Sequence, residues 1–234
     1  MLRFRLTASG DLVVLSDEET VLAEMRRRFP VMGILDGLEN GTWLPCEYCA
    51  QGWDVEEEYL QIAADRYLGR PRLVSETARL RLREVSPWDQ SLCQRLCREM
   101  GEAAFREKEQ FWDQGEAGIR EYIRSAYVLR EAGVWLIEEK ETGLCIGMAG
   151  LEPSFQGEME LSYGIAEAKR RQGFAEEACR AIIDYGWKKL NLQKIFCFVR
   201  ADNLPSQRLA LKLGFQPASD AACAGGRPYI KRRN

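Results

Sequence analysis

The chain has 234 residues, of which 46% are hydrophobic and 29% charged, and its formal net charge is −3. This composition is typical of a globular protein with one large domain, or a medium domain and a small companion, and it excludes a disordered or fibrous chain. No stretch approaches the roughly 18 consecutive apolar residues of a membrane-spanning helix, and the first residues lack the apolar segment of a secretory signal. We therefore expect a cytoplasmic protein with no membrane partner.

The chain contains no histidine, which excludes Ser-His-Asp and Cys-His catalytic sites, histidine-ligated zinc and an imidazole base. Its net negative charge argues against a nucleic-acid partner, since the phosphate backbone requires a basic surface. The eight cysteines are scattered through a chain far larger than disulfide-stapled scaffolds, so we expect reduced thiols. Cys46 and Cys49 have the spacing of a metal knuckle, but no second pair completes four ligands, so we expect an ordinary thiol pair and no metal site.

Charge is unevenly distributed along the chain. Residues 1–75 contain 13 acidic residues, 8 arginines and no lysine, whereas the remainder is slightly basic. The change falls near Gly69 and Pro71, residue types that commonly separate two structured segments. We therefore predict a small α+β domain over residues 1–71, of unknown role, and a larger domain over residues 72–234.

The first domain is predicted to contain two strands joined by a turn at Gly10, followed by two helices. Ser16 and Glu19 have the spacing of a capping box, which favours a helix start at this point. The residues between the two helices are interpreted as a loop. The expected elements are strands over residues 2–6 and 12–15, a first helix capped by Ser16 that would bury residues 21, 22, 25 and 29, and a second helix over residues 55–68.

The second domain is predicted to alternate strands and helices without a regular βαβ repeat, which indicates a mixed α/β or α+β fold. The expected strands cover residues 79–85, 134–138, 145–151, 158–165, 194–200 and 229–231. The expected helices cover residues 88–105, 116–131, 173–190 and 203–213.

The segment from Glu160 to Ala175 combines the end of a strand, a basic loop and the start of a helix. Free amides at a helix start, together with the helix dipole, favour binding of an anionic phosphate. Gly173 allows close approach of a ligand to the backbone, and the basic residues 169–171 add positive charge at the rim. Neither the lysine-containing P-loop nor the three-glycine dinucleotide fingerprint is present in the sequence.

Arg170-x-x-Gly173-x-Ala175 resembles the R/Q-x-x-G-x-G/A motif with which the GNAT superfamily of N-acetyltransferases binds the pyrophosphate of acetyl-CoA. Residues 77–83 and 147–151 resemble the first and third strands of its ribosomal-protein-acetylating branch. Residues 201–206 and 213–215 resemble the N-x-x-S and G-F elements that end the family domain. The resemblance covers residues 76–216 in order and at family spacing.

The resemblance implies a mixed, mostly antiparallel sheet whose fourth and fifth strands splay apart, flanked by helices. It also implies acetyl-CoA as co-substrate, with the pantetheine arm along the fourth strand and the pyrophosphate at the loop before the helix. The coenzyme-binding residues implied in this way are Tyr163, Gly164, Ile165, Arg170, Arg171, Gln172, Gly173, Phe174, Ala175 and Asn203.

The catalytic residues are less sharply indicated than the coenzyme loop. Glu160 is the leading candidate for the base that deprotonates the attacking amine, with Glu158 as the alternate on the same strand face, and a solvated strand carboxylate is the other reading. Many relatives use a tyrosine as the acid for the leaving thiolate, but Ala210 occupies that position. Ser206 is the substitute that the ribosomal branch suggests, and helix capping or a pantetheine contact is its alternative role.

These features together predict an N-acetyltransferase that moves an acetyl group directly from acetyl-CoA to a primary amine of a protein N-terminus or a small molecule. A second reading is an acyl-CoA-binding sensor without turnover. A third is that residues 1–71 form an interaction module that brings the enzyme to a partner.

Overall fold

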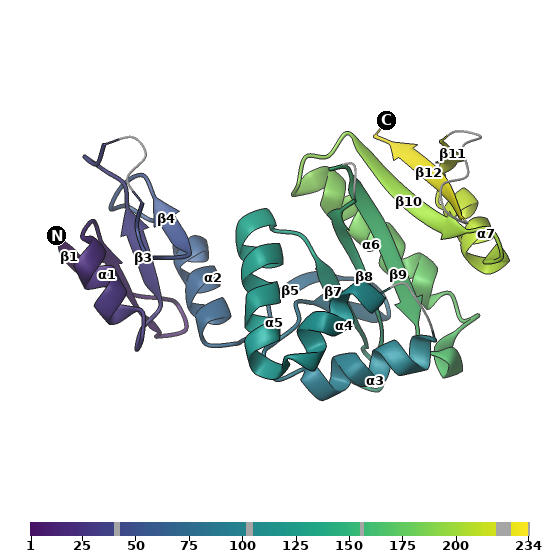
Figure 1. Cartoon of the computed structure of the whole chain (residues 1–234), viewed down its shortest axis with the longest axis horizontal. Coiled ribbons are helices and arrows are strands. Elements are labelled where there is room, and N and C mark those ends of the chain that lie inside the picture. Colours follow the sequence, from purple (N-terminus) through teal and green to yellow (C-terminus); the bar gives the residue numbers. More distant parts are fainter. Residues whose placement is uncertain (40–42, 102–104, 155–156, 219–225, 234) are drawn as a thin grey trace. The chain divides into compact units, whose positions relative to one another are not determined.

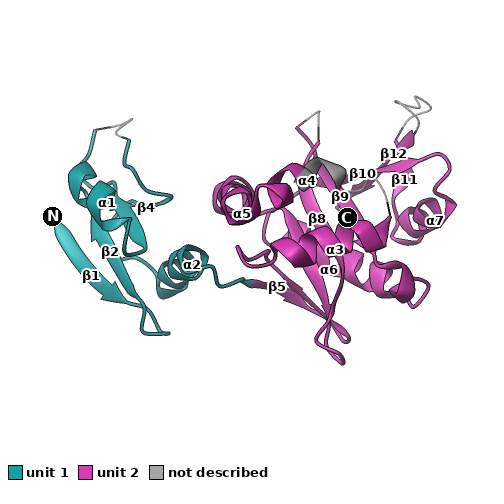
Figure 2. Ribbon diagram, turned by 60° about the horizontal axis from the view of Figure 1, so that its bottom comes forward, with its two compact units in different colours: residues 1–72 teal, residues 73–234 magenta. Residues whose placement is uncertain are grey.

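The computed structural model describes residues 1–39, 43–101, 105–154, 157–218 and 226–233. The chain divides into two compact units, Met1–Arg72 and Leu73–Asn234, called unit 1 and unit 2 below and coloured separately in Figure 2. Within the described ranges, no helix is both long and apolar enough to span a bilayer.

Unit 1 is a four-stranded sheet with two helices (Figure 1). The strands lie in chain order, β1 and β2 forming an antiparallel hairpin while β2, β3 and β4 are parallel. A small apolar core forms around Val14, Leu22, Val31 and Leu44. The elements are β1 (Leu2–Leu6), β2 (Leu12–Ser16), α1 (Glu19–Met25), β3 (Val31–Ile34), β4 (Tyr48–Ala50) and α2 (Glu57–Tyr67).

Two details of unit 1 differ from the sequence predictions. The segment interpreted as a loop contains β3 and β4. Strand β3 lacks apolar–polar alternation because it is buried along its whole length, and β4 has only three residues. The predicted capping box is also wrong. Ser16 is the last residue of β2, where its hydroxyl donates to the Met1 carbonyl and accepts from the Glu18 N–H, and α1 begins at Glu19 without a side-chain cap.

Unit 2 contains an eight-stranded sheet in the order β11-β12-β10-β9-β8-β7-β6-β5. Every neighbouring pair is antiparallel except β9 and β10, which are parallel, so the predicted mixed and mostly antiparallel sheet is confirmed. The strands are β5 (Leu73–Glu76), β6 (Leu80–Arg83), β7 (Val134–Glu139), β8 (Cys145–Pro153), β9 (Met159–Ile165), β10 (Lys194–Arg200), β11 (Gln216–Pro217) and β12 (Gly226–Arg232).

Helices cover both faces of the central strands (Figure 1). Helix α6 packs on one face, where Trp135 of β7 meets Tyr185 edge to face at a centroid distance of 5.0 Å. Helix α3 packs on the other face, with Met100 against Gly164 of β9. The helices are α3 (Gln90–Met100), α4 (Arg106–Asp113), α5 (Gly115–Ile123), α6 (Phe174–Lys188) and α7 (Leu204–Lys212), with a π-helical turn at Arg124–Val128 and a 3₁₀ turn at Glu167–Lys169.

The helical region before β7 differs most from the sequence prediction for unit 2. Instead of two long helices it contains α3, α4 and α5, and residues 102–104 of the predicted first helix lie outside the described residues. Gly101 ends α3 with φ +57° and Gly115 separates α4 from α5 with φ +70°, backbone conformations that favour glycine. Strands β5 and β11 were also missed, because both are short and lie at the edges of the sheet.

The packing of Trp135 generates a stability prediction for unit 2. The Trp135 side chain is 1% exposed, so Trp135→Ala should lower the free energy of unfolding by about 3–5 kcal/mol, measured by urea denaturation. Trp88 is 67% exposed, and Trp88→Ala should cost less than about 1 kcal/mol. Equal losses in the two variants would contradict this description of the core.

Candidate active site

The site begins where β9 and β10 separate. Across the described residues of these strands, the parallel pair is in register only at Glu160 and Phe196. The other edge of β9 pairs with β8 along its whole length, from Met159 to Ile165. The edge of β9 that faces β10 therefore leaves backbone donors and acceptors from residue 162 onward without a strand partner, which is the arrangement that an extended ligand uses to add as a strand.

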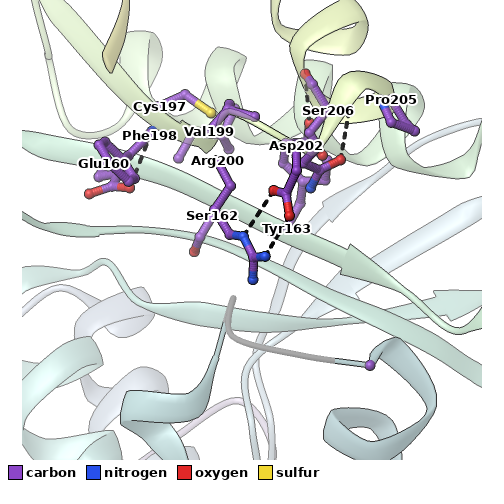
Figure 3. A pocket seen from close by; sticks show the side chains of 13 residues that line it. Glu160, Ser162, Tyr163, Cys197, Phe198, Val199, Arg200, Asp202, Pro205 and Ser206 are labelled. Atoms are coloured by element: carbon purple, nitrogen blue, oxygen red, sulfur yellow. Dashed lines mark hydrogen bonds and ion pairs between the residues drawn. The ribbon is translucent and has the colours of Figure 1, made fainter. Parts of the chain in front are cut away.

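Glu160 lies where β9 and β10 begin to separate. Its Oε1 accepts a hydrogen bond from the backbone N–H of Phe198 at 3.3 Å, so a side chain satisfies an amide of β10 at the point where the strands diverge (Figure 3). The Glu160 carboxylate thus has a structural contact in addition to its place in the cavity described next.

A cavity of about 570 Å³ opens between β9, β10 and the start of α7. Figure 3 shows its side chains, including the ion pair of Arg200 with Asp202, which are 2.6 Å apart. The hydrogen bond from Arg200 lowers the pKa of the Asp202 carboxyl. The cavity is lined by Gly101, Glu160, Leu161, Ser162, Tyr163, Cys197, Phe198, Val199, Arg200, Asp202, Asn203, Pro205 and Ser206.

A second cavity of about 550 Å³ adjoins the first, because Gly101, Tyr163, Asn203, Pro205 and Ser206 line both. It extends along the end of β9 to the loop before α6. Its other lining residues are Met100, Gly164, Ile165, Lys169, Arg170, Arg171, Gly173, Phe174, Ala175, Glu176 and Leu209. The two cavities together therefore run from the α6 loop along the unpaired edge of β9 to Glu160.

The loop before α6 has the backbone of an anion-binding nest. Arg171 and Gly173 have φ values of +60° and +83°, and left-handed residues in such a loop turn successive N–H groups toward one concavity. Gly173 is the N-cap of α6 and provides no side-chain cap. Gly173, Phe174 and Ala175 at the start of α6 line the second cavity, at the end of the helix where the dipole favours negative charge.

Arg79, from the turn before β6, fixes this loop. Its Nη1 donates to the Gln172 carbonyl at 3.0 Å, and its Nε donates to Glu177 Oε2 in the first turn of α6 at 2.7 Å. The guanidinium also lies over the ring of Phe174, 4.4 Å from its centroid. One side chain, nearly 100 residues away in the sequence, thus connects both sides of the nest.

Two of the three basic residues of the loop make contacts with the rest of unit 2. Arg170 donates from Nε to the Ile165 carbonyl at 3.0 Å and from Nη2 to the Met100 carbonyl, which joins the end of β9 to the end of α3. Lys169 pairs with Glu139 at 2.6 Å. These contacts hold the side chains of Lys169 and Arg170 against the protein, although Arg170, like Arg171, is exposed.

The start of α7 forms the opposite wall. Asn203 caps the helix, with Oδ1 accepting the Ser206 N–H at 3.2 Å. The Tyr163 hydroxyl donates to the Ser206 carbonyl at 3.4 Å. Burial raises the pKa of Tyr163, so its hydroxyl stays protonated at neutral pH.

The structure brings nearly all of the sequence-predicted site residues together. Every one lines one of the two cavities except Gln172, which contributes its carbonyl to the Arg79 contact. The alternate base, Glu158, instead pairs with Lys194 at 2.5 Å and lines neither cavity. The site residues that the sequence analysis missed include Arg79, Met100, Gly101, Arg200 and Asp202. Arg79 and Asp202 lie in the segments 77–83 and 201–206 that resemble the family, but the motifs assign no role to these two positions.

The family model described as "Acetyltransferase (GNAT) domain" matches residues 79–216 of this chain, well over half of its length. The chain belongs to the GNAT acetyltransferase family. The matched segment begins at Arg79 and includes every strand and helix that forms the two cavities. The family resemblance inferred from the sequence is thereby confirmed.

Curated relatives in two bacilli match a shorter segment. The uncharacterized N-acetyltransferase YoaA of Bacillus subtilis strain 168 is 38% identical over 84 residues, which cover 35% of this chain and 48% of YoaA. The uncharacterized N-acetyltransferase p20 of Bacillus licheniformis is 38% identical over 88 residues, 37% of this chain and 49% of p20. The chain thus spans about half the length of the curated relatives it matches.

Solved structures support the fold of unit 2. A Bordetella pertussis protein described as a GnaT-family acetyltransferase has a TM-score of 0.55 and 25% identity, covering 68% of this chain and 98% of its own. A Vibrio cholerae protein described as a ribosomal-protein-serine acetyltransferase has a TM-score of 0.51 and 22% identity, covering 68% and 96%. The predicted GNAT fold is therefore confirmed.

The contacts of Glu177 generate a pH-dependent prediction. Burial acts to raise the pKa of this carboxyl, but hydrogen bonds from Thr77 and Arg79 outweigh it and leave the pKa below its usual value of 4.5. A depressed pKa in the folded state means that this stabilisation is complete at neutral pH and is lost as the pH falls below that value. Glu177→Gln should therefore lower the free energy of unfolding by about 1–2 kcal/mol at pH 7, and the difference from wild type should shrink below about pH 4.

The same variant should speed amide hydrogen exchange in residues 170–175, because Arg79 loses a charged partner. The neighbouring Glu176→Gln is the control for exchange, since Glu176 pairs with Arg180 and Lys212 instead. Exchange in the loop that rises equally in both variants would mean that the Arg79–Glu177 contact does not fix it.

Proposed function

We propose that this protein is an acetyl-CoA-dependent N-acetyltransferase that moves an acetyl group to a primary amine while both substrates are bound. One observation carries the proposal. In a member of the GNAT acetyltransferase family, two adjoining cavities follow the unpaired edge of β9 from a nest at the start of α6 to the carboxylate of Glu160. This path has an anion site at one end, strand-pairing groups along it and a candidate base at the other end.

The second cavity is the proposed coenzyme site. The amides at Gly173, Phe174 and Ala175, with the charge of Arg171, would hold the pyrophosphate. The free edge of β9 at residues 163–165 would pair with the pantetheine arm as an added strand, with Asn203 and Ser206 on the facing wall. This arrangement directs the thioester toward the cavity that contains Glu160.

The proposed reaction is a direct displacement in the first cavity. A neutral amine attacks the acetyl carbonyl, a C–N bond forms, the C–S bond breaks, and the thiolate of the coenzyme leaves. Glu160, directly or through water, takes the proton that the ammonium form must lose. A backbone N–H on the free edge of β9 stabilises the oxyanion. Ser206 relays to the leaving thiolate the proton that the nitrogen loses once the C–N bond has formed, and so regains its own proton.

The Glu160 carboxylate, which lines the first cavity, supports a cationic acceptor. Glu152 of β8 lies directly opposite Glu160 in the β8–β9 ladder, so two carboxylates are cross-strand neighbours. Glu152 is held by Lys108 at 3.1 Å and by the Tyr122 hydroxyl at 3.0 Å. We propose a primary amine that is protonated in solution, either a protein N-terminus or a small-molecule amine, as the acceptor class.

The proposed function is tested by calorimetry and by thiol release. The folded 234-residue chain should bind acetyl-CoA in a calorimetric titration, and an amine panel should produce free coenzyme thiol with at least one member. No heat at millimolar acetyl-CoA would contradict the coenzyme site. Binding without thiol release for every amine would instead favour an acyl-CoA-binding sensor without turnover. The observation behind this second interpretation is the buried Ala210, which stands where many relatives have a tyrosine acid.

Glu160→Gln separates the chemical role of this residue from its structural one. Glutamine keeps an oxygen that can accept the Phe198 N–H but cannot take a proton at neutral pH. We expect kcat/KM at pH 7 to fall by about 100-fold, with partial recovery at higher pH as more amine is deprotonated.

Glu158→Gln is the matched control, because Glu158 pairs with Lys194 outside both cavities and its loss should leave kcat/KM within about twofold. An unchanged pH–rate profile in Glu160→Gln would reject Glu160 as the base.

A further inference from the structure

Unit 1 contains a cysteine pair that the proposed transfer reaction does not use. Cys49 lies in β4, and Cys46 precedes the same strand by two residues. Their sulfur atoms are 3.5 Å apart. Cys49 is exposed and Cys46 is half-buried, so one sulfur faces solvent while the other lies behind it.

Both sulfurs pack on the backbone of the neighbouring strand at Gly33. Gly33 is the register partner of Cys49 in the parallel β3–β4 pair. A Cβ on Gly33 would lie 2.7 Å from the Cys46 sulfur and 3.2 Å from the Cys49 sulfur, both closer than ordinary contacts. The absence of a side chain at this position therefore allows the two thiols to share one shallow site over β3.

The segment that presents the pair is held on both sides. The Cys46 N–H donates to the Leu44 carbonyl at 2.8 Å, and Arg26 of the turn after α1 donates to the Pro45 carbonyl at 3.3 Å. Tyr59 of α2 donates its hydroxyl to the Cys49 carbonyl at 3.4 Å. The sulfur–sulfur approach is thus fixed by tertiary contacts of unit 1.

The two thiols differ in acidity. The hydrogen bond from Cys46 lowers the pKa of the Cys49 thiol to about 7, against the opposing effect of partial burial, and the Gly33 backbone adds to the lowering. The same pairing with Cys49, together with burial, raises the pKa of Cys46. At neutral pH the exposed sulfur is therefore the nucleophile and the half-buried thiol keeps its proton.

A metal knuckle is the other use of two cysteines at this spacing. A structural zinc site needs four ligands, and no group of three or more potential metal-ligating side chains comes together in the described part of the chain. The observations favour thiol chemistry over a metal, and the experiment below includes zinc as an outcome.

We propose that Cys46 and Cys49 form a dithiol–disulfide site that exchanges with small-molecule disulfides. The Cys49 thiolate attacks one sulfur of the disulfide, forms a mixed disulfide and releases the first thiolate. Cys46 then loses its proton and attacks Cys49 Sγ, which forms the Cys46–Cys49 bond and releases the second thiolate. The protein dithiol is oxidised by two electrons and the small disulfide is reduced to two thiols.

The geometry requires little movement for this step. A disulfide bond is about 2.05 Å long, so the sulfurs must approach by about 1.5 Å from their present separation. The cysteines of α3 provide a contrast within the chain. Cys93 and Cys97 lie one helical turn apart, but Cys93 is buried and its pKa is raised by burial, which makes it a poor nucleophile.

The test uses the whole 234-residue chain in buffers of reduced and oxidised glutathione at pH 7, followed by differential alkylation and peptide mass spectrometry. The expected result is a two-electron transition in which Cys46 and Cys49 become linked to each other. Cys46→Ser should accumulate a glutathione mixed disulfide at Cys49, and it should form at least about fivefold faster than any at Cys46 in Cys49→Ser, because more of the Cys49 thiol is ionised. The double variant Cys93→Ala/Cys97→Ala should keep the wild-type transition.

Three outcomes would overturn the proposal. The first is a Cys46–Cys49 peptide that stays reduced in the most oxidising buffer while the protein remains folded by circular dichroism. The second is a mixed disulfide in Cys46→Ser that forms no faster than in Cys49→Ser. The third is stoichiometric zinc in the purified wild-type protein that blocks oxidation until a chelator removes it, which would assign the pair to a metal.

Discussion

The separation of β9 from β10 is the constraint on which the candidate site depends. A continuous parallel ladder would consume the edge of β9 and close both cavities. The strands instead register at one pair of residues, and the Glu160 carboxylate accepts the Phe198 amide that the ladder would otherwise use. The unpaired edge that results is both the wall of the cavities and a source of directed backbone groups, and these are the groups that the proposed coenzyme arm would pair with.

Each end of this edge is held by a side chain from a distant part of the chain. Arg170 joins the end of β9 to the end of α3 through two backbone carbonyls, and Arg79 joins the loop before α6 to its first turn. These guanidinium groups have several donors in a rigid plane, which suits them to fixing two backbone segments at once. Positive charge near the loop thus has two roles: Arg171 lines the second cavity, while Arg170 and Arg79 organise the backbone around the proposed anion site.

In unit 1, the close approach of two neighbouring strands creates the proposed thiol site. Its parallel strands bring Gly33 beside Cys49, and the missing side chain leaves space in which two sulfurs meet. The proposed exchange site and the proposed transferase site lie in separate compact units with separate cores, so each can be tested by variants that leave the other unit unchanged. Glu158 serves as the control for Glu160, and the Cys93–Cys97 pair serves as the control for the Cys46–Cys49 pair.

The sequence by itself determined the elements with a clear period and the loop with a clear motif. The strands at 80–83 and 194–200, the helix after Gly173 and the Asn203 cap follow from local alternation, glycine placement and capping chemistry, which act within a few residues. Tertiary structure decided the rest. Strands β3 and β4, the break at Gly101, the clamp by Arg79 and the stacking of Cys46 and Cys49 on Gly33 depend on contacts between residues far apart in the chain, and no local pattern encodes the register and packing that bring them together.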